Sequence, residues 1–187
     1  MVADKPTDKN TARAVLLQAR AERQPEPGED RRRTDALLEL TAQAQTVAAF
    51  VSFGTEPSTV AVLAAWQERG VRVLLPVVLA DLDLEFRLYD GLLVPGRKGM
   101  PCPPPSAPVV PLAEASVVVV PALACDRTGR RLGRGGGSYD RALPRVAPDA
   151  LTVALVHLEE LWPSVPAEPH DVRVKAVLAG DQLVRTG

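Results

Sequence analysis

The sequence is poor in the residues that hold small secreted domains and metal centres together. It has two cysteines, Cys102 and Cys125, which cannot build a disulfide framework, and no group of its residues has the spacing of a zinc site. No apolar run is long enough to span a bilayer, and the first residues lack the apolar core of a secretory signal. These absences predict a cytoplasmic protein without a membrane partner.

The sequence also has almost no excess charge. A formal net charge of −1 argues against a dedicated nucleic-acid binder, which would carry a strongly basic surface. Apolar residues, in contrast, are plentiful, because 46% of the 187 residues are hydrophobic, enough for one domain with a sizeable core. Internal repeats and signs of a second domain are not evident. We therefore expect residues 1–187 to form a single domain, and we expect a monomer.

Helical and strand patterns alternate along the chain. Helical patterns occupy residues 8–23, 30–45 and 57–69. Apolar runs of strand length occupy residues 46–53, 71–79, 84–88, 116–123, 151–156 and 174–178. This alternation predicts an α/β fold, a mainly parallel sheet flanked by helices in a Rossmann-like three-layer sandwich. A ligand would then bind at the carboxyl ends of the strands.

Residues 96–111 interrupt this alternation. The prolines and glycines of this segment exclude a helix or a central strand, because proline lacks the amide hydrogen that both structures require. We expect a long loop here, either ordered or mobile.

The most informative segment is a glycine-rich loop over residues 129–141, which follows the strand predicted over 116–123. Glycine permits positive φ and a close approach of the backbone to a bulky anion, and arginine supplies positive charge. Ser138 is suited to cap a helix that starts at Tyr139, and Asp140 adds a carboxylate suited to magnesium. The loop predicts a phosphate site; the alternative is a surface turn, since the spacing is neither the dinucleotide nor the Walker pattern. The residues concerned are Gly133, Gly135, Gly136 and Gly137, with Arg130, Arg131, Arg134 and Arg141.

A longer motif contains this loop. Residues 126–141 have the pattern Asp-x-x-Gly-x-Arg-Leu-Gly-x-Gly-x-Gly-x-Tyr-Asp-Arg. Three further segments occur in matching order along the chain, namely Lys9-Asn-Thr-Ala-Arg13, Glu56-x-x-Thr59 and Pro166-x-x-x-His170-Asp171. Together they strongly resemble the signature of the 5-formyltetrahydrofolate cyclo-ligase family, also called methenyltetrahydrofolate synthetases. The resemblance covers most of the chain.

The resemblance implies an enzyme of one-carbon metabolism that uses ATP and Mg²⁺ to convert 5-formyltetrahydrofolate to 5,10-methenyltetrahydrofolate, ADP and phosphate. It implies that Glu56 and Tyr139 contact the reduced folate, and that Asp140 and Asp171 hold the metal. Arg134, Tyr139 and Asp140 are expected to act in catalysis. The implied ATP-binding residues are Lys9, Arg13, Arg131, Gly133, Arg134, Gly135, Gly136, Gly137, Ser138, Tyr139, Asp140 and Arg141.

Several of these residues have a purely structural alternative. Lys9 and Arg13 could form a solvated helix face, Glu56 could favour the start of a helix, and Asp171 could be a turn residue. His157 is interpreted as a core or rim residue rather than a ligand. The functions of Arg20 and Arg23 stay open.

The chain also departs from the family pattern. Cys102 stands where many members have glutamate, Lys175 where an acidic residue is common, and Ser138 where a first tyrosine is frequent. Two other function classes therefore stay open. One is a catalytically silent relative that binds nucleotide or folate as a regulatory module, and the other is an ATP-dependent enzyme acting on another pterin or small carboxylate.

Overall fold

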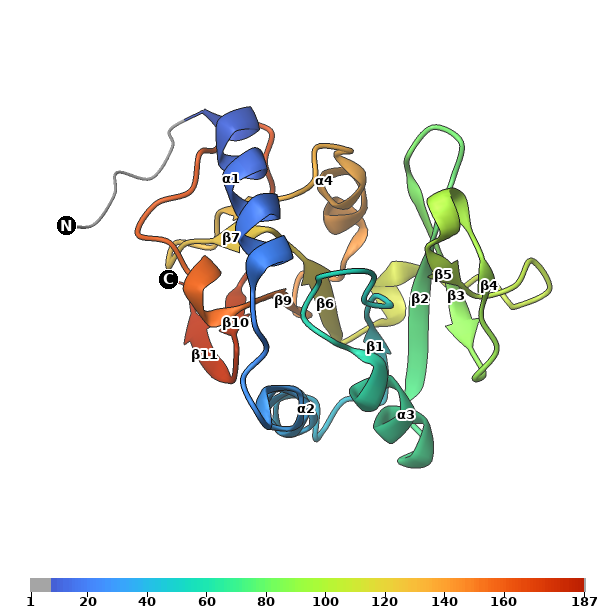
Figure 1. The fold of residues 1–187 in the computed structure, drawn as a ribbon. Coiled ribbons are helices and arrows are strands. Elements are labelled where there is room, and N and C mark those ends of the chain that lie inside the picture. Colours follow the sequence, from blue (N-terminus) through green and yellow to red (C-terminus); the bar gives the residue numbers. More distant parts are fainter. Residues whose placement is uncertain (1–7, 187) are drawn as a thin grey trace.

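A seven-stranded mixed sheet forms the middle of the molecule in the computed structural model, which describes residues 8–186 (Figure 1). The strand order is β11-β10-β9-β6-β1-β2-β3. The inner strands, from β10 to β2, run parallel, whereas β3 and β11 pair antiparallel at the two edges. The strands are β1 (Thr46–Ala48), β2 (Arg72–Val78), β3 (Leu84–Tyr89), β6 (Val117–Pro121), β9 (Leu151–Val156), β10 (Ala176–Ala179) and β11 (Gln182–Arg185). The predicted α/β fold with a mainly parallel sheet is confirmed.

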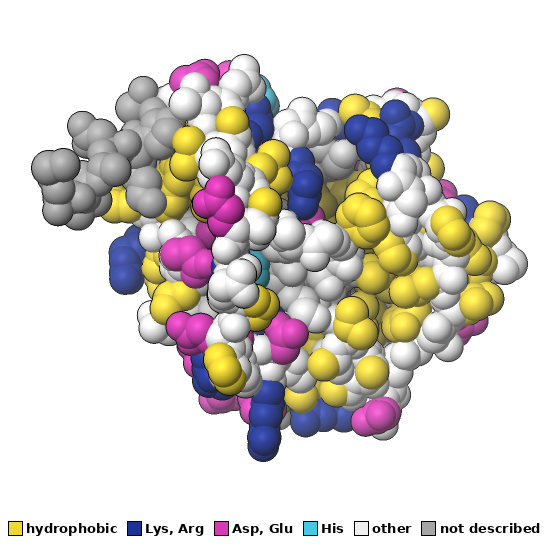
Figure 2. All heavy atoms as spheres, in the orientation of Figure 1, with side chains coloured by type: hydrophobic (Ala, Val, Ile, Leu, Met, Phe, Trp, Pro, Cys, Tyr) yellow, Lys and Arg dark blue, Asp and Glu magenta, His cyan; other side chains and the backbone are white. Residues whose placement is uncertain are grey.

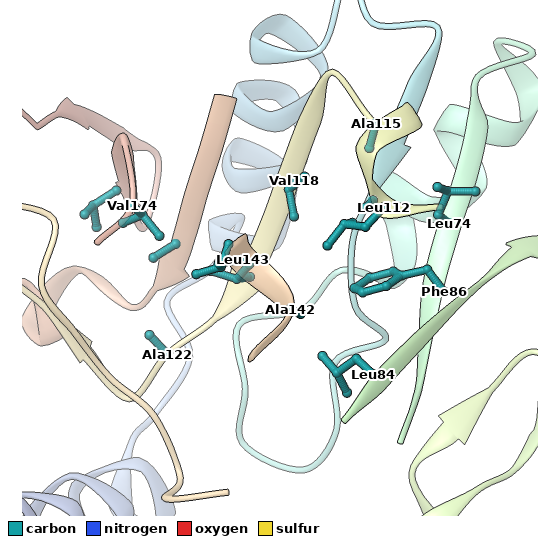
Figure 3. Close-up of a cluster of buried hydrophobic side chains, with 14 of the residues drawn as sticks. Leu74, Leu84, Phe86, Leu112, Ala115, Val118, Ala122, Ala142, Leu143 and Val174 are labelled. Carbon is teal, nitrogen blue, oxygen red and sulfur yellow. The ribbon is translucent and has the colours of Figure 1, made fainter. Parts of the chain in front are cut away.

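Helices cover both faces of this sheet. On one face, Leu37 and Trp66 pack with alternate residues of the strands, and on the other face Ala142 and Leu143 do so. Figure 3 shows part of the second cluster, where Phe86, Leu112 and their neighbours gather beside the strands. Apolar contact on both faces explains why the central strands are continuous apolar runs. The helices are α1 (Lys9–Glu22), α2 (Glu29–Leu40), α3 (Val60–Glu68) and α4 (Ser138–Ala142), followed by the 3₁₀ turn η3 (Leu143–Arg145).

Long-range contacts shorten two of the predicted helices. Helix α2 ends at Leu40 and not at residue 45, because the Thr41 hydroxyl donates to the Leu37 carbonyl (2.7 Å) and accepts from Trp66 Nε1 (2.7 Å). Helix α3 begins at Val60 and not at residue 57. There, the Thr59 hydroxyl donates to the Phe50 carbonyl (2.8 Å) and keeps the preceding residues in a loop.

Strand boundaries shift for similar reasons. β9 matches the predicted residues 151–156, but β1 stops at Ala48, and residues 49–53 leave the sheet to begin the loop that carries Glu56. The edge strand β11 was not predicted, because its residues are mostly exposed and its partner β10 supplies the pairing.

The proline-rich residues 96–111 lie along the β3 edge of the sheet. The Leu88 amide donates to the Pro108 carbonyl (2.9 Å), and the Val110 amide donates to the Phe86 carbonyl (2.9 Å). The segment holds neither an α-helix nor a central strand, as predicted. It contains the 3₁₀ turn η1 (Arg97–Gly99) and strand β5 (Pro101–Cys102), which pairs with β4 (Val94–Pro95), and the turn η2 (Leu112–Glu114) follows it.

Helix α1 packs on a small hairpin beside the main sheet (Figure 1). Its residues Ala12 and Leu16 contact a cluster that includes Leu123, Leu132 and Trp162. The hairpin consists of β7 (Ala124–Cys125) and β8 (Arg131–Leu132), and it leads from β6 to the glycine-rich loop. This packing brings α1 close to that loop.

The connections diverge between two neighbouring strands, β1 and β6. The chain leaves β1 for β2 on one side of the sheet and leaves β6 for β9 on the other side. Such a switch point opens a crevice at the carboxyl ends of the two strands. Among the described residues, helices fall short of the length and apolarity needed to cross a bilayer. The single domain expected over residues 1–187 stays a prediction, since residues 1–7 and 187 lie outside the described part.

Candidate active site

A cavity of about 590 Å³ opens at this switch point. Its walls include Phe50 and Val51, which follow β1, and Ala122 and Leu123, which follow β6. The volume is in the range of small-molecule sites. In Figure 2, hydrophobic side chains gather on the side of the molecule formed by β2 to β5, next to this face. The cavity lies where the sequence predicts ligand binding, at the carboxyl ends of the strands.

The glycine-rich loop forms one wall of the cavity. Gly135 and Gly137 have positive φ angles of 97° and 65°, whereas the φ angles of Gly133 and Gly136 are not positive. The guanidinium of Arg13 lies against Gly135, with its Cζ 3.4 Å from the point where a Cβ would stand. A side chain at position 135 would therefore meet both backbone strain and Arg13.

Helix α1 supplies two cations to the same wall. Arg13 Nε donates to the Gly133 carbonyl (3.0 Å), and Lys9 Nζ forms ion pairs with Asp171 (2.8 Å) and Glu168 (2.7 Å). Burial acts to lower the pKa of Lys9, but its hydrogen bonds to the two carboxylates raise that pKa above the ordinary value. The alternative of a solvated basic face is therefore wrong for this pair.

Two arginines of the loop pair with acidic residues of the site. Arg131 is buried, and its Nη2 donates to Asp140 Oδ1 (2.6 Å). Arg134 is half exposed, and its Nε lies 3.3 Å from Glu56 Oε1. Because Glu56 follows β1 and Arg134 follows β6, this second ion pair joins the two loops across the switch point.

Two details of the loop differ from the sequence prediction. Helix α4 begins at Ser138, with Gly137 as its N-cap in the left-handed conformation, so Ser138 does not cap the helix. Arg141 donates to two backbone carbonyls and, like Arg130, is not among the residues that line the cavity. Arg141 therefore stabilises the loop in this structure and does not face the cavity.

Tyr139 places an unpaired donor in the cavity wall. Its hydroxyl is buried and has no hydrogen-bond partner among residues 8–186, and the same holds for Nε of Arg131. Burial, and then the negative charge of Glu56, raise the pKa of Tyr139 well above its ordinary value. The phenol therefore stays neutral and can donate to a ligand.

The acidic candidates Asp140 and Asp171 belong to adjoining parts of the site. Asp140 Oδ1 accepts from the amide of Val172, the residue after Asp171. Asp171 also belongs to a group with Glu168 and His170 whose ligand atoms all lie within 4.8 Å of one another. Burial acts to raise the pKa of Asp171, but hydrogen bonds from Lys9 and from a backbone amide lower it, so the carboxylate is ionised.

Arg20 reaches the site from the same helix face as Lys9 and Arg13. Its side chain is buried, and it donates to Glu160 Oε1 (2.5 Å) and to the carbonyl of Ala122 (2.6 Å), the residue after β6. The signal was present in the sequence, since the three cations are four and seven residues apart and share one face of a helix.

Other lining residues were not predicted from the sequence as site residues. Arg97, Lys98 and Met100 reach the cavity from the proline-rich segment, and Phe53 reaches it from the loop after β1. Cys102, the departure from the family glutamate, is also a lining residue and is buried. These residues come together only because residues 96–111 lie along the sheet edge.

The other two departures from the family pattern differ in position. Ser138 lines the cavity, whereas Lys175 donates to the carbonyl of Ala150 (2.7 Å) and does not line it. Cys125 is fully buried, and burial raises the pKa of its thiol far above the ordinary value. The Cys125 thiol therefore stays protonated and packs as an apolar side chain.

Known proteins resemble this chain over most of its length. The sequence model of the 5-formyltetrahydrofolate cyclo-ligase family matches residues 5–180. The 5-formyltetrahydrofolate cyclo-ligase of Mycolicibacterium smegmatis is 43% identical over 92% of this chain and 94% of its own length. The enzyme of the same name from Escherichia coli K12 is 33% identical over 75% of this chain and 80% of its own length.

Solved structures share the fold. The NMR structure of Aquifex aeolicus 5,10-methenyltetrahydrofolate synthetase superposes with a TM-score of 0.76 at 22% identity, over 95% of this chain and 92% of that one. A synthetase of the same name from Mycoplasma pneumoniae has a TM-score of 0.74 at 19% identity, over 94% of this chain and 99% of that one. The family resemblance predicted from the sequence is confirmed, and this chain belongs to the 5-formyltetrahydrofolate cyclo-ligase family.

Proposed function

We propose that the cavity at the switch point binds ATP against the glycine-rich loop and 5-formyltetrahydrofolate beside Glu56, and joins them in the cyclo-ligase reaction. The activity itself, an ATP-dependent 5-formyltetrahydrofolate cyclo-ligase, follows from the 43% identical relative and the family match, so that prediction is confirmed. The assignment of residues within the cavity is our proposal. The observation that carries it is the Arg134–Glu56 ion pair of 3.3 Å, which makes the phosphate loop and the loop after β1 two walls of one site.

Charge supports binding of a polyanion at the loop. Seven lysine and arginine residues line the cavity, against four aspartate and glutamate residues. Arg13 and Lys9 extend from α1 over the loop, where they can neutralise a triphosphate together with Arg131 and Arg134. Each of these cations is paired with a protein group in this structure, and incoming phosphate oxygens would share it.

Mg²⁺ fits the donor set of the site. Asp140, Asp171 and Glu168 offer carboxylate oxygens, the ligands that this hard cation prefers. We propose that Asp140 and Asp171, the residues implied by the family, hold it together with ATP oxygens. When bound, Mg²⁺ would supply positive charge to the phosphates. Lys9 and Arg131 neutralise the two aspartates in this structure.

The folate would occupy the part of the cavity near Glu56. The Glu56 carboxylate is only 13% exposed and can accept hydrogen bonds from the pterin N–H groups. Apolar side chains of Phe53, Met100 and Cys102 line the cavity and can pack against a ring system. The neutral hydroxyl of Tyr139 can donate to a substrate oxygen, which fits its proposed role in catalysis.

The reaction needs positioning and charge neutralisation more than a protein nucleophile. The γ-phosphoryl group moves from ATP to the formyl oxygen, which forms a P–O bond and releases ADP. N10 of the folate then bonds to the formyl carbon and loses its proton, and the carbon–oxygen bond breaks to release phosphate. In this proposal Arg134 and Tyr139 stabilise the charge that develops on the transferred phosphoryl and formyl oxygens.

One assay tests this assignment directly. Purified protein with ATP, Mg²⁺ and 5-formyltetrahydrofolate should generate the near-ultraviolet band of the conjugated methenyl product. Omission of ATP, or an ATP analogue that cannot transfer its γ-phosphoryl group, should abolish the band. ATP binding without any methenyl band would indicate a silent relative, and ATP hydrolysis stimulated only by another pterin would refute the folate subsite. The monomeric state and the cytoplasmic location stay predictions.

A further inference from the structure

A buried histidine lies behind the loop that carries Glu56. His157 directly follows β9, is 5% exposed and is not among the lining residues of the cavity. Its Nε2 lies 3.1 Å from the carbonyl oxygen of Thr55, and its Nδ1 lies 3.3 Å from Glu29 Oε1. The imidazole therefore bridges the start of α2 and the residue before Glu56.

The Thr55 carbonyl can only accept a hydrogen bond, so Nε2 of the ring must carry a proton to bind it. On its other side the ring faces Glu29, which is ionised, since hydrogen bonds from Arg23 and His157 overcome the effect of burial and lower its pKa to about 2. The His157 side chain also accepts from the backbone amide of Glu160. The hydrogen bond to Thr55 is therefore the contact that joins the ring to the loop after β1.

The charges around the ring come from α1, α2 and the 3₁₀ turn η4 (Leu158–Glu160) and are mutually paired. The backbone amide of His157 donates to Glu160 Oε2 (2.9 Å), and Glu29 is the carboxylate that faces the ring itself. The arginines of this region are each engaged with a carboxylate: Arg20 with Glu160, Arg23 with Glu29 and Glu159, and Arg33 with Glu29. The ring is thus held in a network of paired charges, and its Nε2 faces the Thr55 carbonyl.

The loop after β1 is fixed at its base and sparsely held at its tip. At the base, Ser52 and Thr59 exchange hydrogen bonds of 2.9 and 3.1 Å. At the tip, Phe53 and Thr55 are exposed, and the Glu56 carboxylate accepts from the Phe53 amide (3.0 Å) within the loop itself. Among the hydrogen bonds and ion pairs of residues 8–186, only the His157–Thr55 hydrogen bond and the Arg134–Glu56 ion pair join this tip to other elements.

We propose that His157 is a positioning residue for the folate subsite, which fixes Glu56 through its hydrogen bond to the Thr55 carbonyl. This inference rests on the proposed contact of Glu56 with the folate. The ion pair with Arg134 cannot fix the position of Glu56 once ATP is bound, because the phosphates compete for the Arg134 guanidinium. His157 then becomes the remaining external anchor of the tip, and its loss should weaken folate binding while leaving ATP binding alone.

Two substitutions separate the two hydrogen bonds of the ring. His157→Asn places an amide nitrogen near the position of Nδ1, so it can keep the contact with Glu29 and loses the contact with Thr55. His157→Gln places its amide nitrogen near the position of Nε2, so it keeps the contact with Thr55. The two variants are matched in polarity and differ in which partner is retained.

Calorimetric titration with 5-formyltetrahydrofolate and with ATP measures the effect. We expect His157→Asn to raise the folate Kd about tenfold, the contribution of one hydrogen bond, with the ATP Kd unchanged. His157→Gln should stay close to the wild type for both ligands.

Other outcomes overturn the inference. Equal losses of ATP and folate affinity would indicate a general structural role, and an unchanged folate Kd in His157→Asn would remove the positioning role. If His157→Asn does not fold, ring ¹⁵N spectra of the wild type decide the question, since the chain has two histidines. A ring without a proton on Nε2 contradicts the proposal, because it could not donate to the Thr55 carbonyl. A wild type that binds no folate would refute the proposed function itself, which is a distinct result.

Discussion

Asp140 contributes both to the stability of the glycine-rich loop and to the proposed reaction. Asp140→Asn should therefore lower the free energy of unfolding and the rate of turnover. The carboxylate accepts from Arg131 Nη2 at 2.6 Å, and the Arg131 side chain is 4% exposed. Asparagine keeps an acceptor for the Val172 amide but removes the charge that balances the buried guanidinium. Breaking a fully buried ion pair costs about 3–5 kcal/mol, and since Asp140 is 22% exposed and the hydrogen bond survives, we expect a loss of about 2 kcal/mol in the free energy of unfolding.

Turnover should fall further than stability alone explains. Loss of one charged group from a site that stabilises phosphoryl transfer costs about 3 kcal/mol, or roughly a hundredfold in rate. Urea denaturation measures the first effect, and the methenyl band measured against Mg²⁺ concentration measures the second.

Asp83→Asn is the matched control, because Asp83 also pairs with an arginine, Arg145, at 2.9 Å, but both side chains are substantially exposed. For Asp83→Asn we expect a loss of less than about 1 kcal/mol in the free energy of unfolding and little change in turnover. A stable Asp140→Asn protein with wild-type turnover at limiting Mg²⁺ would refute the roles given to Asp140.

Two further predictions concern acidic residues at the edges of the site. Glu56→Gln should weaken folate binding by about 1.5–3 kcal/mol, the contribution of a charged hydrogen bond, and ATP binding should not weaken, since Arg134 is released for the phosphates; calorimetry giving equal losses for both ligands would exclude Glu56 from the folate subsite. Glu29 should make the protein sensitive to acid, because its pKa is lowered from 4.5 to about 2 in the folded state. The stabilisation that Glu29 contributes is complete above pH 4.5 and disappears as the pH falls towards 2, a change of about 3 kcal/mol. The free energy of unfolding should therefore depend less on pH over this range in Glu29→Gln than in the wild type. The same pH dependence in both proteins would contradict this assignment.

Local sequence patterns were sufficient where neighbours in the chain decide the outcome. Strand β9 has the predicted bounds, because six successive residues carry an apolar pattern that fits a strand buried on both faces. Gly135 and Gly137 adopt the positive φ that glycine permits at little cost. The family motif over residues 126–141 likewise identified the loop and the family before any fold was known.

The ends of helices and the ion pairs of the site could not be predicted from local sequence patterns in this way. Helix α2 ends where Trp66, which is 25 residues further along the chain, donates to Thr41. Periodicity could not reveal this contact, because it belongs to the packing of α2 on α3. Position 138 shows the same limit, since its serine was expected to cap α4 and the chain uses Gly137 in the left-handed conformation instead.

The sequence by itself therefore determined the alternation of elements, the glycine-rich loop and a set of site residues of which nearly all reach the cavity. Only the tertiary structure decided how their charges are paired. Arg134 meets Glu56, and His157 meets both Glu29 and Thr55, across separations of about 80 to 130 residues. The physical reason is that strand order places the carboxyl ends of β1, β6 and β9 side by side, and electrostatic and hydrogen-bond energies depend on these distances in space and not on separation along the chain.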